Sequence, residues 1–568
     1  MHYRHIVPAA LALVAALSAC QDGELMGPAM RGGPPAAPRL LASGAGSNYA
    51  YTCHPSIAPN QAAANQRLDE LYADWKTKYV RTAHVGMRVL FEKNNNASKS
   101  VSEGIGYGML LSAYFGDKPV FDGLWAYAKS TINPARGHTL MPWEIQANGT
   151  VIGGGDFATD GDEDIAFALL VADFRWGGYK TDATALINSL LTYGVEADNT
   201  VNAGLWASND NVNPSYFDPA YYKAFAIYTG NSRWNDVAAR SHVVLNNIET
   251  FKAGRRLLPD WSTVYGDTAL NLRAPTDHEY GYDAVRVPWR MAKDAVWNCD
   301  PDARARLDRM NAFWAERGGV SGIRDGYKLE GDTLNGNQSD TFTGPAAAGA
   351  ITYTSSRTFV EAFYNNASNV AVWSTGVDDG YYSDHLRLLG LLLATGNMPH
   401  PFYTLVESFE WGQMTGWRGY AGTGSTATAT VVAPGGRSSR YAVKLDYAIS
   451  SYGGLIREYA TSQDWRYHAG IRFRFKGSGT GNWIQVELQD NRGPDPITGA
   501  SETFIWGFTD NQTTWREITI PWTAFTRNSW QATGAPNDGL TLSQVWGLAF
   551  TPGGTGSFQV DEVALTKW

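Results

Sequence analysis

The chain has 568 residues and a formal net charge of −9, and 18% of its residues are charged, against about 25% in typical soluble domains. Single cores stop growing at about 250–300 residues, so this length predicts at least two domains. The acidic balance and the lack of a basic stripe exclude nucleic-acid binding as the main function, because such binding depends on neutralising phosphates.

The N-terminus is expected to be an export signal. The apolar run Ile6–Ala19 is too short to span a bilayer. Residues 1–19 end in LSA before Cys20, which resembles a bacterial lipobox and implies cleavage, acylation of Cys20 and a lipid anchor. Gln21 follows Cys20, which implies that the lipid anchor lies in the outer membrane, with the protein facing either the periplasm or the medium. A secreted protein with an ordinary signal peptide is the alternative. Residues 20–49 are expected to be a flexible Pro/Gly/Ala tether.

Residues 50–399 show helical periodicity between Gly- and Asn-rich loops. Expected helical segments include 62–79, 108–115, 158–176, 221–228, 237–251 and 386–394. The segment 158–176 is the most informative, because four acidic residues open a strongly apolar helix. Thr159 or Asp160 is expected to cap it. The acids fit either a solvated helix start or carboxylates held for chemistry.

The order of this segment, ATDGDEDIAFALLVADFRW, resembles the signature of glycoside hydrolase family 8, which contains cellulases, lichenases, chitosanases and xylanases. Further segments match the same family in the same order: VSEGIGYGM (101–109), LMPW (140–143), NPSYFDPAYY (213–222), LPDW (258–261), YGYDAVRVPWR (280–290) and YYSDHLRLLGLLLATGN (381–397). The resemblance covers residues 50–399 and implies an all-α (α/α)6 barrel.

The resemblance also places the catalytic carboxyls. Cleavage of a glycosidic bond usually needs one protonated and one ionised carboxyl. Glu103 matches the proton donor, Asp283 the catalytic base, and Asp160 a third essential carboxylate that holds the sugar. Arg286 lies one helical turn after Asp283 and can keep it ionised. The family match implies inversion, with carboxyls roughly 6.5–9.5 Å apart. A capping box with Ser100 and a structural Asp–Arg pair are the alternatives.

Aromatic residues in the same motifs are candidates for substrate binding, because sugar rings offer C–H faces that lie against aromatic rings. The chain has 21 Trp and 29 Tyr. Tyr216 and Tyr282 are expected to orient the attacking water. Trp143, Trp206 and Trp125 are expected to be stacking platforms, and core packing is the alternative for each of them.

No metal or cofactor is expected. Asp160, Asp162 and Asp164 give the D-x-D-x-D beginning of a calcium loop, but the sixth and twelfth positions are Ile165 and Val171 instead of Gly and Glu. The hydrolytic mechanism itself requires no cofactor.

The cysteines leave two alternatives open. Cys53 and Cys299 form a disulfide outside the cytoplasm or remain buried free thiols. No CxxC or His/Cys cluster is present in the sequence, which argues against a structural zinc site.

The pattern changes to β after the helical region, with 400–405 as a linker and 406–568 as an all-β, jelly-roll-like sandwich. Strands are expected at 441–449, 471–476, 483–489, 504–508, 515–522, 545–551 and 558–565. The segments ESFEWGQMTGW, TTWREITIPWTAF and GSFQVDEVALTKW are similar to carbohydrate-binding modules of family 11, which bind β-glucans.

Alternation along 483–489 predicts a binding groove on this module. Gln485, Glu487 and Gln489 are expected to face outward and to line a groove with Trp506 and Tyr452. A merely solvated polar face is the alternative.

Together these features predict a monomeric inverting endo-β-1,4-glucanase of cellulase or lichenase type, which acts on β-linked polysaccharide and touches a membrane only through its lipid anchor. A chitosanase or xylanase of the same family is the alternative. A non-catalytic polysaccharide-binding lipoprotein is the alternative of another class, and the intact Glu103, Asp160 and Asp283 argue against it.

Overall fold

The computed structural model describes residues 51, 54, 56–91, 99–152, 155–207, 211–267, 277–369, 380–407, 409, 414, 416–435, 441–466 and 468–566. The export signal 1–19, Cys20, the tether 20–49 and Cys53 lie outside the described residues. Cys299 is disulfide-bonded, so the free-thiol alternative is wrong for this residue, and its expected pairing with Cys53 stays a prediction. Among the described residues, no helix combines the length and apolarity needed to cross a membrane.

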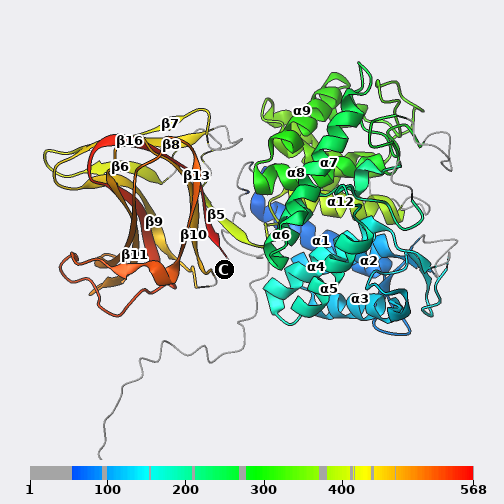
Figure 1. Ribbon diagram of the computed structural model, residues 1–568, viewed down its shortest axis with the longest axis horizontal. Helices are drawn as coiled ribbons and strands as arrows, with labels where there is room; N and C mark the ends of the chain where they lie inside the picture. Colours follow the sequence, from blue (N-terminus) through cyan, green and yellow to red (C-terminus); the bar gives the residue numbers. More distant parts are fainter. Residues whose placement is uncertain are drawn as a thin grey trace, which may run out of the picture. The chain divides into compact units, whose positions relative to one another are not determined.

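The first domain is helical (Figure 1). Within the described residues its helices are α1 (Gln61–Tyr79), α2 (Ser102–Phe115), α3 (Lys118–Thr131), α4 (Thr159–Trp176), α5 (Lys180–Tyr193), α6 (Pro219–Thr229), α7 (Arg233–Thr250), α8 (Val287–Asn298), α9 (Pro301–Glu316), α10 (Asp340–Gly349), α11 (Arg357–Ser368) and α12 (Gly380–Ala394). Every helix expected from the sequence is present. Two small two-stranded sheets join β1 (Val80–Thr82) to β2 (Met87–Val89) and β3 (Lys99–Val101) to β4 (Glu144–Gln146).

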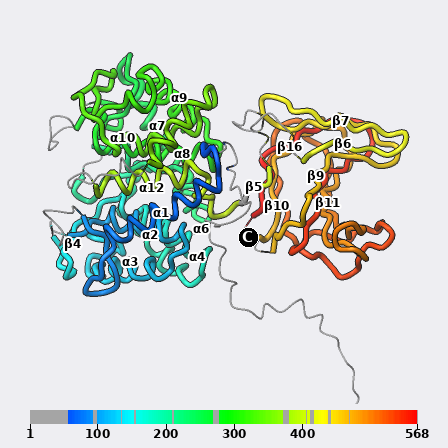
Figure 2. Tube along the Cα trace, turned by 180° about the vertical axis from the view of Figure 1, so that it is seen from behind, coloured from blue at the N-terminus to red at the C-terminus, as the bar shows by residue number. Residues whose placement is uncertain are grey.

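The even-numbered helices form a closed inner ring. Each contacts the next even-numbered helix, and α12 returns to α2, while the odd-numbered helices pack outside their even-numbered neighbours. Figure 2 shows the same helices from behind. This is the (α/α)6 arrangement that the family resemblance implies. Inner helices are buried on nearly all sides, and in α2 Glu103 alone is not fully buried.

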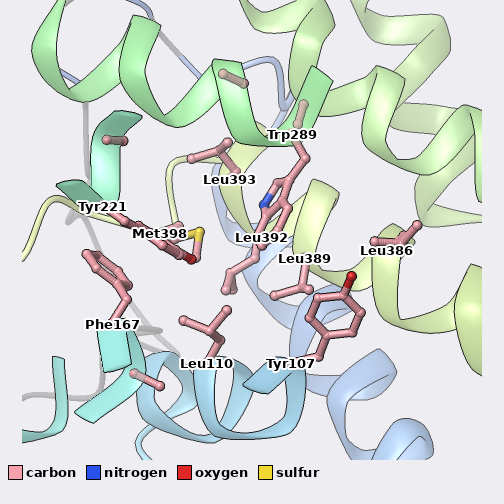
Figure 3. Packing of buried hydrophobic residues seen from close by; sticks show 14 of the residues in the cluster. Tyr107, Leu110, Phe167, Tyr221, Trp289, Leu386, Leu389, Leu392, Leu393 and Met398 are labelled. Carbon is pink, nitrogen blue, oxygen red and sulfur yellow. The ribbon is translucent and has the colours of Figure 1, made fainter. Parts of the chain in front are cut away.

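Large apolar side chains fill the middle of this ring. Figure 3 shows side chains from α2, α4, α6, α8 and α12 meeting there, and Leu110, Phe167, Tyr221, Trp289 and Leu389 are completely buried. Phe167 stacks on Tyr221 with ring centroids 3.9 Å apart. The packed centre fixes the inner helices relative to one another, and with them the side chains at their ends.

The N-terminus of α4 differs from the predicted cap. Ala158 precedes the helix, and neither Thr159 nor Asp160 caps it through its side chain. Asp160, Asp162, Glu163 and Asp164 are all buried, so the reading of a solvated helix start is wrong. Buried acids need hydrogen-bond partners, and the partners of Asp160 and Asp164 are the arginines of the site described below.

The second domain is a sandwich of two six-stranded sheets. One has the order β13-β10-β16-β8-β7 with β5 added beside β16, and the other the order β14-β12-β11-β15-β9-β6. The strands are β5 (Tyr403–Glu407), β6 (Trp417–Ala421), β7 (Thr426–Val432), β8 (Ala442–Ile449), β9 (Gly453–Gln463), β10 (Gly470–Lys476), β11 (Trp483–Gly493), β12 (Ala500–Thr509), β13 (Arg516–Pro521), β14 (Thr526–Arg527), β15 (Val545–Pro552) and β16 (Gly554–Thr566). All seven expected strands are present, and β5 overlaps the segment 400–405 expected to be a linker.

Strand β11 follows the predicted alternation of buried and outward-facing residues, but Trp506 in the neighbouring strand β12 does not face the predicted side. Ile484, Val486 and Leu488 are buried, and Gln485, Glu487 and Gln489 are half-buried between them. Trp506 of β12, however, pairs with Val486 of β11 and packs against the core, so its assignment to the groove is wrong. Directly paired residues share a face, and Val486 faces inward.

Candidate active site

Arg286 lies at the centre of a cluster of three carboxylates. Its Nη1 donates to Glu103 Oε2 at 2.8 Å and to Asp160 Oδ2 at 2.5 Å, and its Nη2 donates to Asp283 Oδ1 at 2.6 Å. The guanidinium is 1% exposed. A planar guanidinium can serve several carboxylates at fixed angles, so these three acids from distant motifs are held in one constellation.

These residues converge because inner helices begin at the same end of the ring. Glu103 and Asp160 lie in the first turns of α2 and α4, and Asp283 precedes the short 3-10 helix Ala284–Arg286 that leads into α8. Helix N-termini carry partial positive charge, which favours carboxylates at these positions.

Small residues let α2 and α4 approach closely at the site. A Cβ at Gly106 would lie 2.7 Å from the Asp164 Cβ, and a Cβ at Gly161 would collide with Ser102 and with the Glu103 backbone. Side chains larger than hydrogen would therefore push the two helices apart and separate Glu103 from Asp160.

Glu103 has the environment of a proton donor. Its side chain is 19% exposed, and Tyr381 at the start of α12 donates to its Oε1 at 3.1 Å. Burial, helped by the negative Asp160 and Asp283, raises the pKa of Glu103 to about 7 against the opposing effects of Arg286 and Tyr381. The carboxyl is therefore protonated in mildly acidic solution.

The Asp283 carboxylate accepts more side-chain hydrogen bonds than the Glu103 carboxyl does. Besides Arg286, the indole of Trp261 donates to its Oδ2 at 3.2 Å, and the side chain of Asn213 hydrogen-bonds to it. Burial raises the pKa of Asp283, while Arg286, Asn213 and Trp261 act against that rise. Hydrogen bonds to the charged form favour the carboxylate, so Asp283 suits the role of a base.

A second layer of ion pairs lies one helical turn deeper. Arg290 follows Arg286 by four residues, and Asp164 follows Asp160 by four. Arg290 donates to both oxygens of Asp164 at 2.6 and 2.9 Å, and all of these atoms are buried. The bidentate pair joins α8 to α4 directly below the pair Arg286–Asp160, and therefore limits how far the upper pair can move.

A cavity of about 740 Å³ opens above the cluster. Glu103 and Asp283 both line it, together with Phe91, Asp260, Asp277, Gly281, Tyr282, Asp325, Gly326, Leu334, Asn335, Phe342, Tyr381 and Tyr382. The lining combines aromatic rings with carboxylate and amide groups, which suits a ligand with both C–H faces and hydroxyl groups.

Comparisons with known proteins identify the family of each domain. Residues 42–396 match the model of glycosyl hydrolases family 8. The chain belongs to this family. Residues 399–567 match the carbohydrate-binding domain of family 11. The protein is therefore a glycoside hydrolase with an appended carbohydrate-binding module.

Individual relatives give the same picture. The chain is 39% identical over 379 residues to Endoglucanase A of Acetivibrio thermocellus, covering 64% of this chain and 77% of that one. It is 36% identical over 365 residues to Endoglucanase 2 of Ruminiclostridium josui, covering 62% and 76%. The apo structure of a β-1,3-1,4-glucanase from Paenibacillus sp. X4 superposes with a TM-score of 0.57 at 29% identity, covering 64% of this chain and 99% of that one.

Within this family 8 domain, four of the five aromatic candidates lie around the cluster. The Arg286 guanidinium lies 5.2 Å from the Tyr216 ring, and Tyr282 lines the cavity with its hydroxyl bonded to Asp325 at 2.8 Å. Trp206 is 53% exposed and packs against Trp261, with ring centroids 5.7 Å apart. An exposed indole beside a residue that touches Asp283 is well placed to stack on a sugar.

Trp143 lies at the rim of the same region. It is partly buried, and its backbone oxygen accepts from the Ser102 N–H at 2.9 Å, directly before Glu103. Trp125 lies elsewhere, buried in α3, where its indole donates to Asp182 at 2.8 Å. The structure does not bring Trp125 to the carboxylate cluster, and the core alternative holds for it.

One group of side chains has the spacing of a metal site. His242, Asp294 and Asp300 place their ligand atoms within 4.8 Å of one another. The ammonium of Lys223, however, donates to Asp294 and Asp300, in each case at 2.8 Å. Lysine supplies the positive charge that the two carboxylates need, so this cluster is a buried ion-pair network of α6, α7 and α8.

Four residues of the site were not expected from the sequence: Asn213, Asp260, Trp261 and Tyr381. All four lie inside motifs that were noticed (NPSYF, LPDW and YYSDH). Their contacts to Glu103 and Asp283 join segments far apart in the chain, and no local spacing reveals such contacts.

Proposed function

We propose that the protein is an inverting endo-β-1,4-glucanase that hydrolyses cellulose-type or mixed-linkage β-glucan. The observation that carries this proposal is the single guanidinium of Arg286 bound to Glu103, Asp160 and Asp283 at the floor of the cavity. The endoglucanase and β-glucanase names of the relatives support β-glucan as the substrate.

The different surroundings of the two carboxyls assign the roles. Glu103, with its pKa raised to about 7, donates its proton to the glycosidic oxygen as the bond from that oxygen to C1 breaks. Asp283 accepts a proton from a water whose oxygen bonds to C1 on the opposite face of the ring. Attack from the opposite face inverts the anomeric configuration. Exchange of protons with solvent then restores both carboxyls.

Asp160 and two tyrosines assist this step. Asp160 is fixed by Arg286, beside Glu103, and is placed to hold the hydroxyl groups of the sugar at the cleavage point. Tyr216, whose ring lies against the Arg286 guanidinium, and Tyr282, which lines the cavity, are our candidates for orienting the attacking water. Fixed polar groups of this kind stabilise the developing charge because they need no rearrangement during the reaction.

The β domain supplies an open surface for polysaccharide. Gln485 pairs with Gly507 and Thr551, and Glu487 pairs with Ile505 and Ala549, so two small residues, Gly507 and Ala549, lie beside the polar row. The Trp483 indole covers Gly507 on this face. A sugar ring can stack on this indole while the glutamine amides beside it contact the hydroxyl groups of the sugar.

Tyr452 extends the same face at its other side. Its ring lies over Gly422 and is 63% exposed, close to Tyr420, whose hydroxyl bonds the Thr551 Oγ1 at 3.1 Å. Binding of glucan on this face raises the concentration of substrate near the catalyst without changing the chemistry.

The proposed substrate is tested by release of reducing sugars from barley β-glucan, carboxymethylcellulose, chitosan and xylan. We expect rapid release from the first two, with a steep early fall in viscosity that indicates internal cleavage. Release from chitosan or xylan alone would assign a different polysaccharide, and no release from any of the four would favour a binding protein.

We also propose that the mature protein is a lipoprotein anchored through Cys20 to the outer membrane. The LSAC sequence before the tether supports this proposal. Metabolic labelling with radioactive palmitate in a bacterial host should label the wild-type protein and leave Cys20→Ala unlabelled. Equal labelling of both, or of neither, would contradict the anchor.

A further inference from the structure

The motif LPDW ends in a carboxylate that binds the backbone around the catalytic base. Asp260 Oδ1 accepts from the N–H groups of Gly281, Asp283 and Ala284 at 3.0, 3.0 and 2.6 Å. These three donors surround the Cα of Asp283 in the chain. A single oxygen therefore fixes the backbone on both sides of the residue that activates water.

The two motifs are also joined through their own backbones. The Asp260 N–H donates to the Glu279 oxygen at 2.8 Å, and the Trp261 N–H donates to the Asp277 oxygen at 2.7 Å. Trp261 then donates its indole N–H to Asp283 Oδ2. Adjacent side chains of one segment thus hold the same residue twice, Asp260 through the backbone and Trp261 through the carboxylate.

The fit around Asp260 is tight. A Cβ at position 281 would collide with Asp260 Oδ2, so glycine is needed there for the carboxylate to reach its three donors. Asp260 is 9% exposed, which places its hydrogen bonds mostly out of water, where they are stronger and more costly to lose.

We propose that Asp260 is a positioning residue for catalysis, which holds the segment 281–284 so that the Asp283 carboxylate faces the attacking water. This inference rests on the proposed role of Asp283 as the base. Displacement of a reacting group by about 1 Å can cost on the order of 100-fold in rate. Loss of Asp260 is therefore expected to slow the chemical step by displacing Asp283.

Asp260 lines the same cavity as Asp283, so the two could exchange roles. Their hydrogen bonds distinguish them. Asp260 Oδ1 accepts hydrogen bonds from three backbone N–H groups. The Asp283 carboxylate instead accepts hydrogen bonds from the side chains of Arg286, Trp261 and Asn213, and it lines the cleft. A base needs an oxygen lone pair that can accept a proton from water. The Oδ1 lone pairs of Asp260 are already occupied by backbone N–H groups.

The test compares Asp260→Ala with Asp260→Asn in the full chain. Alanine removes the acceptor, and asparagine keeps one carbonyl oxygen for the three N–H groups. On soluble barley β-glucan we expect Asp260→Ala to lower kcat about 100-fold at nearly unchanged KM, and Asp260→Asn to recover most of that loss. Asp495→Asn is the matched control, because Asp495 Oδ1 also accepts two backbone N–H groups, each at 2.8 Å, in the β domain.

A double-mutant cycle with Asp283→Asn separates positioning from general damage to the fold. If Asp260 acts through the base, Asp260→Ala should cost almost nothing in the Asp283→Asn background, because the group it positions is already gone. Additive losses, a rise in KM instead of a fall in kcat, or full activity of Asp260→Ala would overturn the proposal.

Gly281→Ala provides an independent variant, because it displaces the Asp260 carboxylate without removing it. We expect a fall in kcat similar to that of Asp260→Ala, and wild-type kcat would also overturn the proposal. A different result would contradict the proposed role of Asp283 as the base. In that case Asp283→Asn would remain active, whatever the activity of the Asp260 variants.

Discussion

The catalytic cluster of the helical domain and the outer face of β11 in the β domain hold polar groups in opposite ways. In the catalytic cluster of the helical domain, charges are buried and shared: Arg286 contacts three carboxylates, of which Glu103 lies 183 residues away from it in the chain. In the β domain, Gln485, Glu487 and Gln489 stand side by side on an open sheet face, each between buried neighbours of its own strand. The first arrangement adjusts the protonation of its members, and the second presents hydroxyl-binding groups over a long surface.

This difference follows from what each domain must do. Acid and base catalysis at one pH requires two carboxyls with different protonation, and the different hydrogen-bond donors around Glu103 and Asp283 favour this difference. Binding a chain of neutral sugars requires many weak contacts spread over several rings. The comparison predicts that single changes in the helical cluster are drastic and that single changes on the sheet face are mild.

Glu103→Gln should have the largest effect. Glutamine keeps the shape but has no proton to donate, so kcat should fall about 10⁴-fold with little change in KM. Steady-state kinetics on barley β-glucan measure this. Glu144→Gln, which alters a glutamate paired with Lys99 outside the cavity lining, is the control. Activity of Glu103→Gln near that of the control would remove Glu103 from its role.

Asp283→Asn should lower kcat about 10³-fold, because the amide cannot accept the proton of water. The smaller variant Asp283→Gly leaves room for azide, which needs no deprotonation. Added azide should restore turnover and give a glycosyl azide of inverted configuration, observable by NMR. A product azide of retained configuration would indicate a nucleophile on the other face of the ring.

Trp206→Ala should weaken substrate binding by about 10-fold, equivalent to about 1.4 kcal/mol, while leaving kcat largely intact. The reason is that the exposed indole offers a stacking face and takes no part in proton transfer. Values of KM for soluble glucan test this. Trp125→Phe is the comparison, because Trp125 is buried in α3, and an equal rise of KM in both variants would contradict the assignment.

Changes on the sheet face should be milder and should depend on the physical form of the substrate. Trp483→Ala combined with Tyr452→Ala should reduce binding to insoluble β-glucan several-fold and leave cleavage of soluble glucan unchanged, because the helical cleft is untouched. Trp530→Ala is a matched control, since that residue is 69% exposed on a different loop. Loss of soluble activity in the double variant would mean that these rings serve the stability of the protein.

The smallest expected effect is a shift in pH dependence. The value of kcat/KM should fall above about pH 7, because Glu103, whose pKa is raised to about 7, then loses its proton. Tyr381 donates to Glu103 and lowers its pKa, so Tyr381→Phe should raise the pKa and move this alkaline limb to higher pH. A shift to lower pH would contradict the hydrogen bond.

Sequence reasoning predicted what is local. The helices and strands follow from periodicity, and Glu103, Asp160 and Asp283 follow from the resemblance of their motifs to glycoside hydrolase family 8. The pairing of Asp283 with Arg286, three residues on, was also predictable from helical spacing. Each of these inferences depends only on residues within one segment.

What could not be predicted depends on contacts between segments. Arg286 also binds Glu103 and Asp160, and the ring closure that brings them together is absent from any local pattern. Trp506 was placed on the wrong face because the alternation of β11 and that of β12 are related only through their register. Trp125 was expected at the cleft because the sequence of a helix does not show which other helix packs against its aromatic residues.

The central claim is that a proton leaves Glu103 while Asp283 activates water on the other side of the sugar ring. Time-resolved proton NMR of barley β-glucan hydrolysis tests it most directly, because the anomeric signal of the first products appears before mutarotation. The account predicts that the new reducing ends form as α-anomers. New reducing ends that form as β-anomers would show retention and would contradict it.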